Sequence, residues 1–259
     1  MTGSVAPAGP VLFARYAYPP NALGYCGPGD PSALLGAATD GTDIVGLSHL
    51  AARFEGAWPY LQLLADCSGI DDPLDRRVVE AYWIGNPLLA YVPGPVLARS
   101  ISDRFEHRVG RRFEALVSAV PAGGVPQHSF HVFAVYPWLG LLRAGNDAPA
   151  MEVLNRCRIR WGRVESVIGD SVVVTSRPLV FDGSRLALGA EQPEVARCSI
   201  EGTGFVTDLA PGDVVSLHWD WVCDRLSPTG LGWLRYSTGR NLAAVNSLPE
   251  PGPAVVCDA

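Results

Sequence analysis

Two short stretches of the sequence carry side chains suited to binding a metal ion. The first begins with the thiol of Cys157 and ends at Val164, and the second begins at Pro211 and ends with the imidazole of His218. Thiolate sulfur and neutral imidazole are the protein ligands that suit soft and intermediate transition metals. Both stretches contain the apolar and β-branched residues typical of strands. The sequence therefore predicts one potential ligand on each of two strands.

Arginines surround the first of these two residues. Arg156, Arg158 and Arg160 flank Cys157, and because nearby positive charge favours a thiolate, we expect a lowered pKa for this thiol. Two alternatives stay open. A cysteine is often a small buried core residue, and His218 on its strand is equally well explained as a hydrogen-bonded core histidine.

Two histidines in the N-terminal half form a second candidate site. His128 and His131 stand three positions apart, so on a helix they would share one face, as metal ligands must. The alternative is a pair of structural histidines with hydrogen bonds at the start of a helix. In a metal-dependent enzyme, this pair would line a pocket between two domains together with Tyr25, Cys26, Glu55 and Trp58.

The segment 11–30 supplies two of those pocket residues. It is rich in glycine and contains Pro19 and Pro20, which we expect to interrupt the apolar run that precedes them. The segment is predicted to form a packed N-terminal arm. As the alternative, its turns would direct Tyr25 and Cys26 into a pocket.

The elements that must position these residues fall into two halves. Before residue 150, apolar residues recur with helical spacing, with one helix expected to open at Asp72 and the longest to run from about Gly94 to Val120. After Cys157, short β-branched runs alternate with tight turns, as in a small closed barrel. Ser227-Pro228 has the composition of a helix start and predicts a terminal helix.

The expected fold is therefore α+β. An α-helical domain (residues 1–153) packs on a small β-barrel of the HypC/OB type with a terminal helix (residues 154–246), and residues 247–259 form an extended, proline-rich tail. The two parts lack a flexible linker, so we expect them to pack together.

Composition narrows the classes of function. The net charge of −6 argues against binding to nucleic acid or to anionic membranes, because both require a positive surface. There is no signal peptide or long apolar run, which predicts a cytoplasmic protein. The six cysteines include no C-x-x-C pair and are expected to be reduced thiols. No nucleotide-binding loop or nucleophile motif is present, so no catalytic residue is assigned.

The second half resembles the HypC/HupF hydrogenase-maturation chaperones over roughly residues 155–245. That family carries Cys-x-x-x-Pro-Gly-x-Val, then Gly-Asp-x-Val-x-Val-His-x-Gly-Phe before a terminal helix. The matching residues here are Cys157, Gly162, Val164, Gly212, Asp213, Val215, Leu217 and His218. The departures are an internal cysteine, Trp161 for the proline, and Asp220-Trp221 for the final Gly-Phe. The N-terminal half resembles an uncharacterised actinobacterial helical domain.

The resemblance implies a maturation role rather than an enzyme. Such chaperones hold an iron that carries cyanide and carbon monoxide, and they pass it with a scaffold partner to the hydrogenase large subunit. Cys157 and His218 would bind this iron intermediate, and Cys26, His128, His131, Tyr25 and Glu55 are secondary candidates. The expected partners are the hydrogenase large subunit or a maturation scaffold protein. The alternatives are the metal-dependent enzyme around His128 and His131, and a purely structural protein-interaction module.

Overall fold

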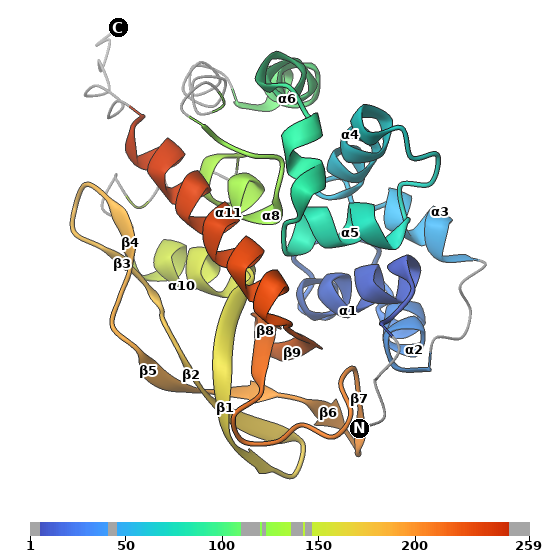
Figure 1. The fold of residues 1–259 in the computed structure, drawn as a ribbon, viewed down its shortest axis with the longest axis vertical. Coiled ribbons are helices and arrows are strands. Elements are labelled where there is room, and N and C mark those ends of the chain that lie inside the picture. The colour runs from blue at the N-terminus through green and yellow to red at the C-terminus, as the bar shows by residue number, and fades with distance from the viewer. Residues whose placement is uncertain are drawn as a thin grey trace, which may run out of the picture.

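The computed structural model of the chain describes residues 6–40, 46–109, 120, 123–135, 142 and 147–248. Within these residues an N-terminal helical region is followed by a β-sheet and one long C-terminal helix (Figure 1). This confirms the α+β class and the predicted order of its parts. None of the helices in these parts of the chain combines the length and apolar character needed to cross a membrane.

The helical region consists of short segments joined by tight turns. In chain order they are α1 (Gly9–Ala22), α2 (Ser32–Asp40), α3 (Leu47–Ala52), α4 (Trp58–Ser68), α5 (Arg76–Trp83), η2 (Pro87–Tyr91), α6 (Gly94–Val109), α8 (His128–Phe130), η4 (His131–Val135) and α10 (Asp147–Cys157). Asp75 caps α5 by accepting a hydrogen bond from the Arg77 amide. The predicted start at Asp72 is wrong, because Asp72 instead accepts from the Leu74 amide in the preceding turn.

The first helix differs from its sequence prediction. α1 continues through Pro19 and Pro20 to Ala22 and is buried along most of its length. The two prolines are tolerated because they lie near its C-terminal end, where each removes one bond to a carbonyl four residues earlier. The arm is packed, as predicted, but it is helical. Because α1 contacts α2, α5, β8 and β9, it lies between the helical region and the sheet.

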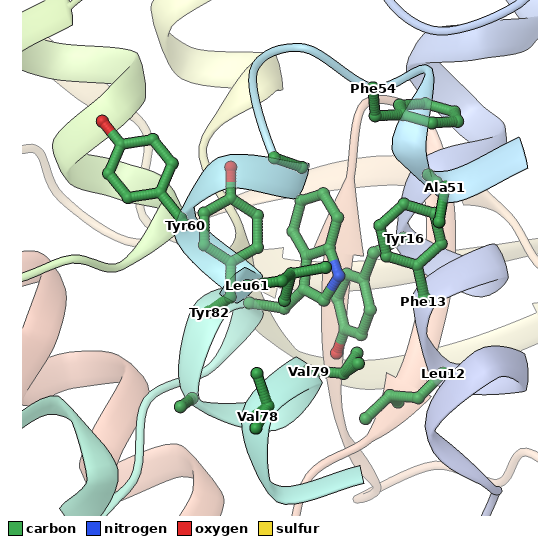
Figure 2. Close-up of a cluster of buried hydrophobic side chains, with 14 of the residues drawn as sticks. Leu12, Phe13, Tyr16, Ala51, Phe54, Tyr60, Leu61, Val78, Val79 and Tyr82 are labelled. Carbon is green, nitrogen blue, oxygen red and sulfur yellow. The ribbon is translucent and has the colours of Figure 1, made fainter. Parts of the chain in front are cut away.

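An aromatic cluster packs around α1, α4 and α5. Tyr16 stacks on Trp83 with ring centroids 5.4 Å apart. Figure 2 shows Tyr60 and Tyr82 at one side of this cluster, and their rings stack with centroids 5.6 Å apart. Since packed aromatic side chains have few alternative rotamers, this part of the core is a rigid support for neighbouring polar groups.

The sheet is mainly antiparallel. Its strands are β1 (Arg160–Ile168), β2 (Ser171–Ser176), β5 (Gln192–Arg197), β8 (Val214–His218) and β9 (Trp221–Arg225). They pair in the order β1-β2-β5-β9-β8, and β8 pairs in turn with β1. The β5–β9 pairing is a single parallel bridge between Arg197 and Trp221. Val172 and Val174 alternate with half-buried neighbours along β2 and contribute to a small core of their own.

Two short hairpins accompany the sheet. They are β3 (Leu179–Phe181) with β4 (Leu186–Leu188), and β6 (Ser199–Ile200) with β7 (Thr203–Gly204). The predicted turn at Asp182-Gly183 is confirmed, and the Asp182 carboxylate accepts hydrogen bonds from the Ser184 and Arg185 amides. Side-chain bonds of this kind stabilise the turn without a contribution from the core.

The terminal helix α11 (Pro228–Asn246) joins the two halves. It begins at the predicted Ser-Pro pair, and the Ser227 hydroxyl accepts a hydrogen bond from a backbone amide of the first turn. Figure 1 shows it crossing the molecule beside α8. Asn241 donates to the Ser129 hydroxyl of α8, and Asn246 bonds the backbone of Leu186 in β4.

The division into residues 1–153, 154–246 and 247–259 stays a prediction. Ile159 and Trp221, from the second part, belong to the same hydrophobic core as the N-terminal helices, so burial is continuous across the predicted boundary. The expected continuation of the longest helix over 110–119 and most of the expected tail, 249–259, lie outside the described residues.

Candidate metal centre

Three side chains with metal-binding atoms meet near the junction of the helical region and the sheet. His128 begins α8, Cys157 ends α10 and His218 ends β8. One ligand atom of each residue lies within 4.8 Å of the others, and all three residues are buried. Among the residues that the structure describes, no other group of three or more histidines, cysteines and carboxylates gathers in this way. We refer to these three residues as the His/Cys/His cluster.

Hydrogen bonds determine the tautomer of His128. Its Nε2 lies 2.8 Å from the Cys157 carbonyl oxygen, which can only accept, so Nε2 carries the proton. Nδ1 therefore accepts from the Tyr82 hydroxyl, 3.1 Å away. Nε2 is also 4.0 Å from the Cys157 sulfur and so faces the cluster. Burial lowers the pKa of His128 to about 4, which keeps the imidazole neutral near pH 7.

His218 is held in the opposite tautomer. Its Nδ1 lies 2.6 Å from the Tyr16 carbonyl oxygen, so Nδ1 is the donor and Nε2 holds a lone pair. With no proton, Nε2 cannot donate to the Cys157 carbonyl. It is buried and has no hydrogen-bond partner. Burial, and next the neighbouring His128, lower the pKa of His218 well below its usual value. The cluster thus contains a buried imidazole nitrogen with an unused lone pair.

The expected thiolate at Cys157 is wrong for this state of the protein. Burial raises the pKa of the thiol, Cys26 adds to the effect, and Trp219 opposes it. On a strand, the residues next to Cys157 would alternate between its two faces. Cys157 is instead the last residue of a helix, so that alternation does not apply, and the thiol is neutral near pH 7.

The flanking arginines are bound to other groups. Arg156 is half-exposed and forms an ion pair with Asp220, with its nitrogen 2.7 Å from the carboxylate. Arg158 is buried and donates to the Arg177 carbonyl. Arg160 forms an ion pair with Glu194, at 3.2 Å. Their charges are therefore committed to partners other than the Cys157 sulfur.

Trp219 and Tyr25 form an aromatic pair beside the cluster. Trp219 directly follows His218, is buried, and has a left-handed φ of 51°, which is rare for a bulky residue. Tyr25 stacks on its ring with centroids 4.1 Å apart and is 52% exposed. Cys26 is half-buried, and burial raises the pKa of its thiol to about 12. Tyr25 and Cys26 thus lie beside the ligand atoms and are not among them.

The other secondary candidates lie outside the cluster. His131 belongs to η4 and meets the Tyr60 ring edge-on, with centroids 5.6 Å apart. Burial lowers its pKa well below the usual value. The helix changes to a π-type turn after Phe130, so a spacing of three does not give the shared face expected from an α-helix. Glu55 is exposed.

A hollow of about 600 Å³ lies on the surface of the helical region, away from the predicted pocket residues. Its lining residues are Ser68, Gly69, Ile70, Asp71, Asp72, Asp75, Arg77, Leu88 and Tyr91. None of the pocket residues expected for the enzyme alternative is among them. The hollow therefore gives no support to a pocket around His128 and His131.

The donor set of the cluster fits a transition metal. Two neutral imidazoles and one thiol suit zinc, copper or iron better than magnesium or calcium. On binding, the Cys157 thiol would lose its proton. The proton of His128 would move from Nε2 to Nδ1, where the Tyr82 oxygen can accept it. Tetrahedral zinc holds its nitrogen and sulfur ligands roughly 3.3–3.6 Å apart, so atoms within 4.8 Å of one another need only a modest contraction. Three protein ligands leave a fourth position for a small exogenous ligand.

The sequence predicted Cys157 and His218 as a pair, through the resemblance, but placed His128 in a separate candidate site. His128 was paired with His131 by local spacing, whereas its partners in space are Cys157 and His218. Tyr82 and the Tyr16 carbonyl, which orient the two imidazoles, were not identified. Proline within an apolar helical pattern was the available signal for Tyr16, since it leaves a carbonyl without its usual donor.

Comparison with known proteins gives a family but no described activity. No curated protein matches the chain, and no solved structure matches it either. One family model covers residues 5–251, a range that includes all three residues of the cluster and both halves of the fold. The chain therefore belongs to the DUF6390 family, which is described as a family of unknown function.

Proposed function

We propose that the chain binds a transition-metal ion at the His/Cys/His cluster and acts as an accessory protein in the assembly of a metal centre. The single observation that carries this proposal is the buried Nε2 of His218, which has no hydrogen-bond partner. Leaving a buried acceptor unsatisfied costs about 1–3 kcal/mol. A metal ion shared with Cys157 and His128 would use this lone pair.

The more specific form of the proposal is a role in [NiFe]-hydrogenase maturation. It rests on the resemblance of residues 155–245 to the HypC/HupF chaperones. The pairing of strands from β1 around to β8 supports a HypC/OB-like barrel. The two residues that the resemblance singles out, Cys157 and His218, are close enough to share a metal. The cargo would be an iron with cyanide and carbon monoxide ligands, and thiolate suits such iron.

Burial adds a requirement to this role. Cys157 is 7% and His218 1% exposed, so a partner cannot reach a bound metal while the surroundings stay closed. We propose that the hydrogenase large subunit, or a maturation scaffold, displaces the Tyr25–Trp219 pair when metal is transferred. An iron carrier with a closed site would protect its cargo from water until it meets that partner.

Metal titration tests the general proposal. Purified metal-free protein is titrated with zinc and with cobalt(II), whose absorption spectrum reports thiolate ligation. We expect one equivalent to bind, and we expect Cys157→Ala, His218→Ala and His128→Ala each to weaken binding by at least about a hundredfold, because each removes a ligand from a three-residue site.

Two matched variants serve as controls. Cys223→Ala removes another fully buried cysteine, and His49→Ala removes an exposed histidine. Both should bind metal as the unchanged protein does. If the unchanged protein binds less than stoichiometric metal, or if the controls lose affinity as the cluster variants do, the metal proposal is wrong.

Co-isolation tests the specific role. Tagged protein is recovered from a host that expresses a [NiFe]-hydrogenase with its maturation proteins. We expect the large-subunit precursor or the scaffold protein to be recovered with it, together with iron. If neither protein is recovered with the tagged chain from that host, the maturation role is refuted. Metal binding is then judged by the titration alone.

A second candidate function is a protein-interaction module that uses no metal. The observation that favours it is a set of apolar side chains exposed on the strands, which include Ile168, Val180 and Val195. A partner recovered equally well with Cys157→Ala and His218→Ala would support this function instead. Loss of the partner in both variants would support the metal-dependent role.

A further inference from the structure

We propose that Pro20 is a positioning residue for the metal centre, because it reserves the Tyr16 carbonyl for His218 and so fixes Nε2 of His218 as the ligand atom. This inference rests on the proposed function, since it states how the same site is prepared for metal. It concerns a residue in the N-terminal helix that touches none of the three ligands through its own polar atoms.

Pro20 cannot donate a hydrogen bond from its backbone nitrogen. In an α-helix the amide of each residue donates to the carbonyl four positions earlier. Any residue with an amide hydrogen at position 20 of the chain would therefore donate to the Tyr16 carbonyl. Proline has no amide hydrogen. The Tyr16 carbonyl therefore lacks its helical donor while lying inside a helix that continues to Ala22.

The His218 imidazole takes the place of the missing backbone donor. Nδ1 of His218 lies 2.6 Å from the Tyr16 oxygen, across a separation of 202 residues. Both side chains are buried, with Tyr16 at 0% and His218 at 1% exposure. No water competes at such a position, so the bond holds the imidazole in a single tautomer with the proton on Nδ1.

The bond to Tyr16 determines which nitrogen of His218 faces the cluster with a lone pair. With the proton on Nδ1, the lone pair of His218 lies on Nε2, the buried atom without a partner. Metal-binding histidines commonly donate their second ring nitrogen to a carbonyl in this way, and loss of that donor contact weakens metal binding about ten- to a hundredfold. A backbone carbonyl cannot be removed by mutation, but its availability can be changed through the residue that competes for it.

Pro20→Ala is the direct test. Alanine restores an amide that would share the Tyr16 carbonyl with His218 and so weaken the bond from Nδ1. Alanine also suits a helix better than proline does, so the variant should fold. In metal-free protein, nitrogen NMR of the histidine rings should show His218 purely Nδ1-protonated before the change and a mixture of tautomers after it. Cobalt(II) affinity should fall about tenfold, with the thiolate charge-transfer band retained.

Pro19→Ala is the matched control. It replaces the adjacent buried proline of the same helix, but the amide it restores faces the Arg15 carbonyl, which His218 does not use. In Pro19→Ala, the tautomer of His218 and the affinity for cobalt(II) should be unchanged. If Pro20→Ala leaves the tautomer of His218 unaltered, or if Pro19→Ala alters it equally, Pro20 has no positioning role.

The two readouts separate this inference from the proposed function. The tautomer is measured without metal, so a mixture in Pro20→Ala would support the positioning contact even if the unchanged protein failed to bind cobalt. Stoichiometric cobalt binding with an unaltered tautomer in Pro20→Ala would retain the metal site and refute the role of Pro20.

Discussion

Residues 157–160 contribute to two buried polar clusters, which differ in charge and in how many of their polar atoms have hydrogen-bond partners. Cys157 joins His128 and His218 in a cluster of neutral groups. Arg160, three residues later, is 2% exposed and belongs to a charged cluster with Glu194. His218 of the neutral cluster ends β8, and Arg160 of the charged cluster donates to the carbonyl of Trp219, the next residue. The two clusters are therefore neighbours, and the contrast is in how completely their polar atoms are used.

The charged cluster is closed by hydrogen bonds. The Arg160 guanidinium binds both carboxylate oxygens of Glu194 at 3.2 Å. It also donates to the carbonyls of Trp219, Arg156 and Asn155, so each of its three nitrogens has a partner. Burial pushes the pKa of Glu194 upward, but Arg160 and its hydrogen bonds prevail and lower it. A saturated ion pair of this kind has no capacity left for a ligand.

The neutral cluster keeps one position open. Its His218 has one ring nitrogen bound to a carbonyl and the other without a partner. Other buried side-chain atoms of the described residues also lack a partner, but Nε2 of His218 is set apart because it lies close to the metal-binding atoms of His128 and Cys157. The candidate site therefore differs from the charged cluster in two respects, an unused lone pair and neighbouring atoms that could share a ligand with it.

The largest effect is expected when the charged cluster is broken. Arg160→Met leaves the Glu194 carboxylate partly buried without its cation and removes support from the Trp219 carbonyl, so the free energy of unfolding should fall by about 3–5 kcal/mol. Urea denaturation of the metal-free protein measures this. Arg163→Met, an exposed arginine of the same strand, should change it by less than about 0.5 kcal/mol. A loss below 1 kcal/mol for Arg160→Met would mean that the ion pair is not structural.

Acidification should weaken the protein through its buried neutral histidines. Burial lowers the pKa of His128 to about 4 in the folded state, against about 6.5 when unfolded. The unfolded chain therefore binds more protons between these values, and stability falls as the pH drops from about 6.5 to about 4, by about 1.4 kcal/mol per pH unit for each such histidine.

Urea midpoints across this pH range test the assignment. His128→Gln should flatten the slope by about one proton, because glutamine does not titrate. His49→Gln, which changes an exposed histidine, should leave the slope as it is. An equal slope in His128→Gln and the unchanged protein would show that His128 is not buried in its neutral form.

Removing the support of His128 should weaken metal binding more than folding. Tyr82→Phe deletes the hydroxyl that lies 3.1 Å from Nδ1 of His128, so we expect about a tenfold loss of cobalt affinity and a loss of about 1 kcal/mol in stability. Tyr60→Phe is the control, since this ring stacks beside Tyr82 in the same core. Equal losses of affinity in the two variants would exclude a specific role for the Tyr82 hydroxyl.

The smallest effect is expected at the aromatic pair. Tyr25→Ala removes a half-exposed ring from Trp219, which should cost about 0.5–1 kcal/mol in stability. It should also speed release of bound zinc to a chromogenic chelator several-fold, because the cluster loses part of its cover. Tyr236→Ala removes a similarly exposed ring from Trp233 and should leave the release rate unchanged. Identical release rates in all three proteins would place the exit route elsewhere.

The fold was largely predictable because its signals are local. Ser227-Pro228 and Asp182-Gly183 specify their helix start and turn through contacts within a few residues. The course of α1 was not predictable from its prolines, because its burial against other elements outweighs two lost helical bonds. Helix propensity describes an isolated segment, whereas in α1 tertiary packing determines that the helix continues through both prolines.

The candidate site was predictable in its membership and not in its geometry. Cys157 and His218 were singled out by resemblance, and His128 by its chemistry. The thiolate prediction failed because burial raises the pKa of Cys157, and the three neighbouring arginines bind other partners and do not offset it. His128, Cys157 and His218 come together because α8, α10 and β8 meet in space, and a single sequence carries little information on how such distant elements pack.

The long sequence separations within the site have a consequence for synthesis of the protein. The Tyr16–His218 contact spans 202 residues, whereas His128 and Cys157 are 29 apart. During translation the Tyr16 carbonyl of the N-terminal helix cannot meet the His218 imidazole until β8, the last strand but one, has emerged from the ribosome. A nascent or truncated chain that lacks β8 offers only two of the three ligands. At the proposed site, metal loading would therefore report that β8 has been made and has reached the N-terminal helix, and a chain that ends before β8 would lack a complete set of ligands.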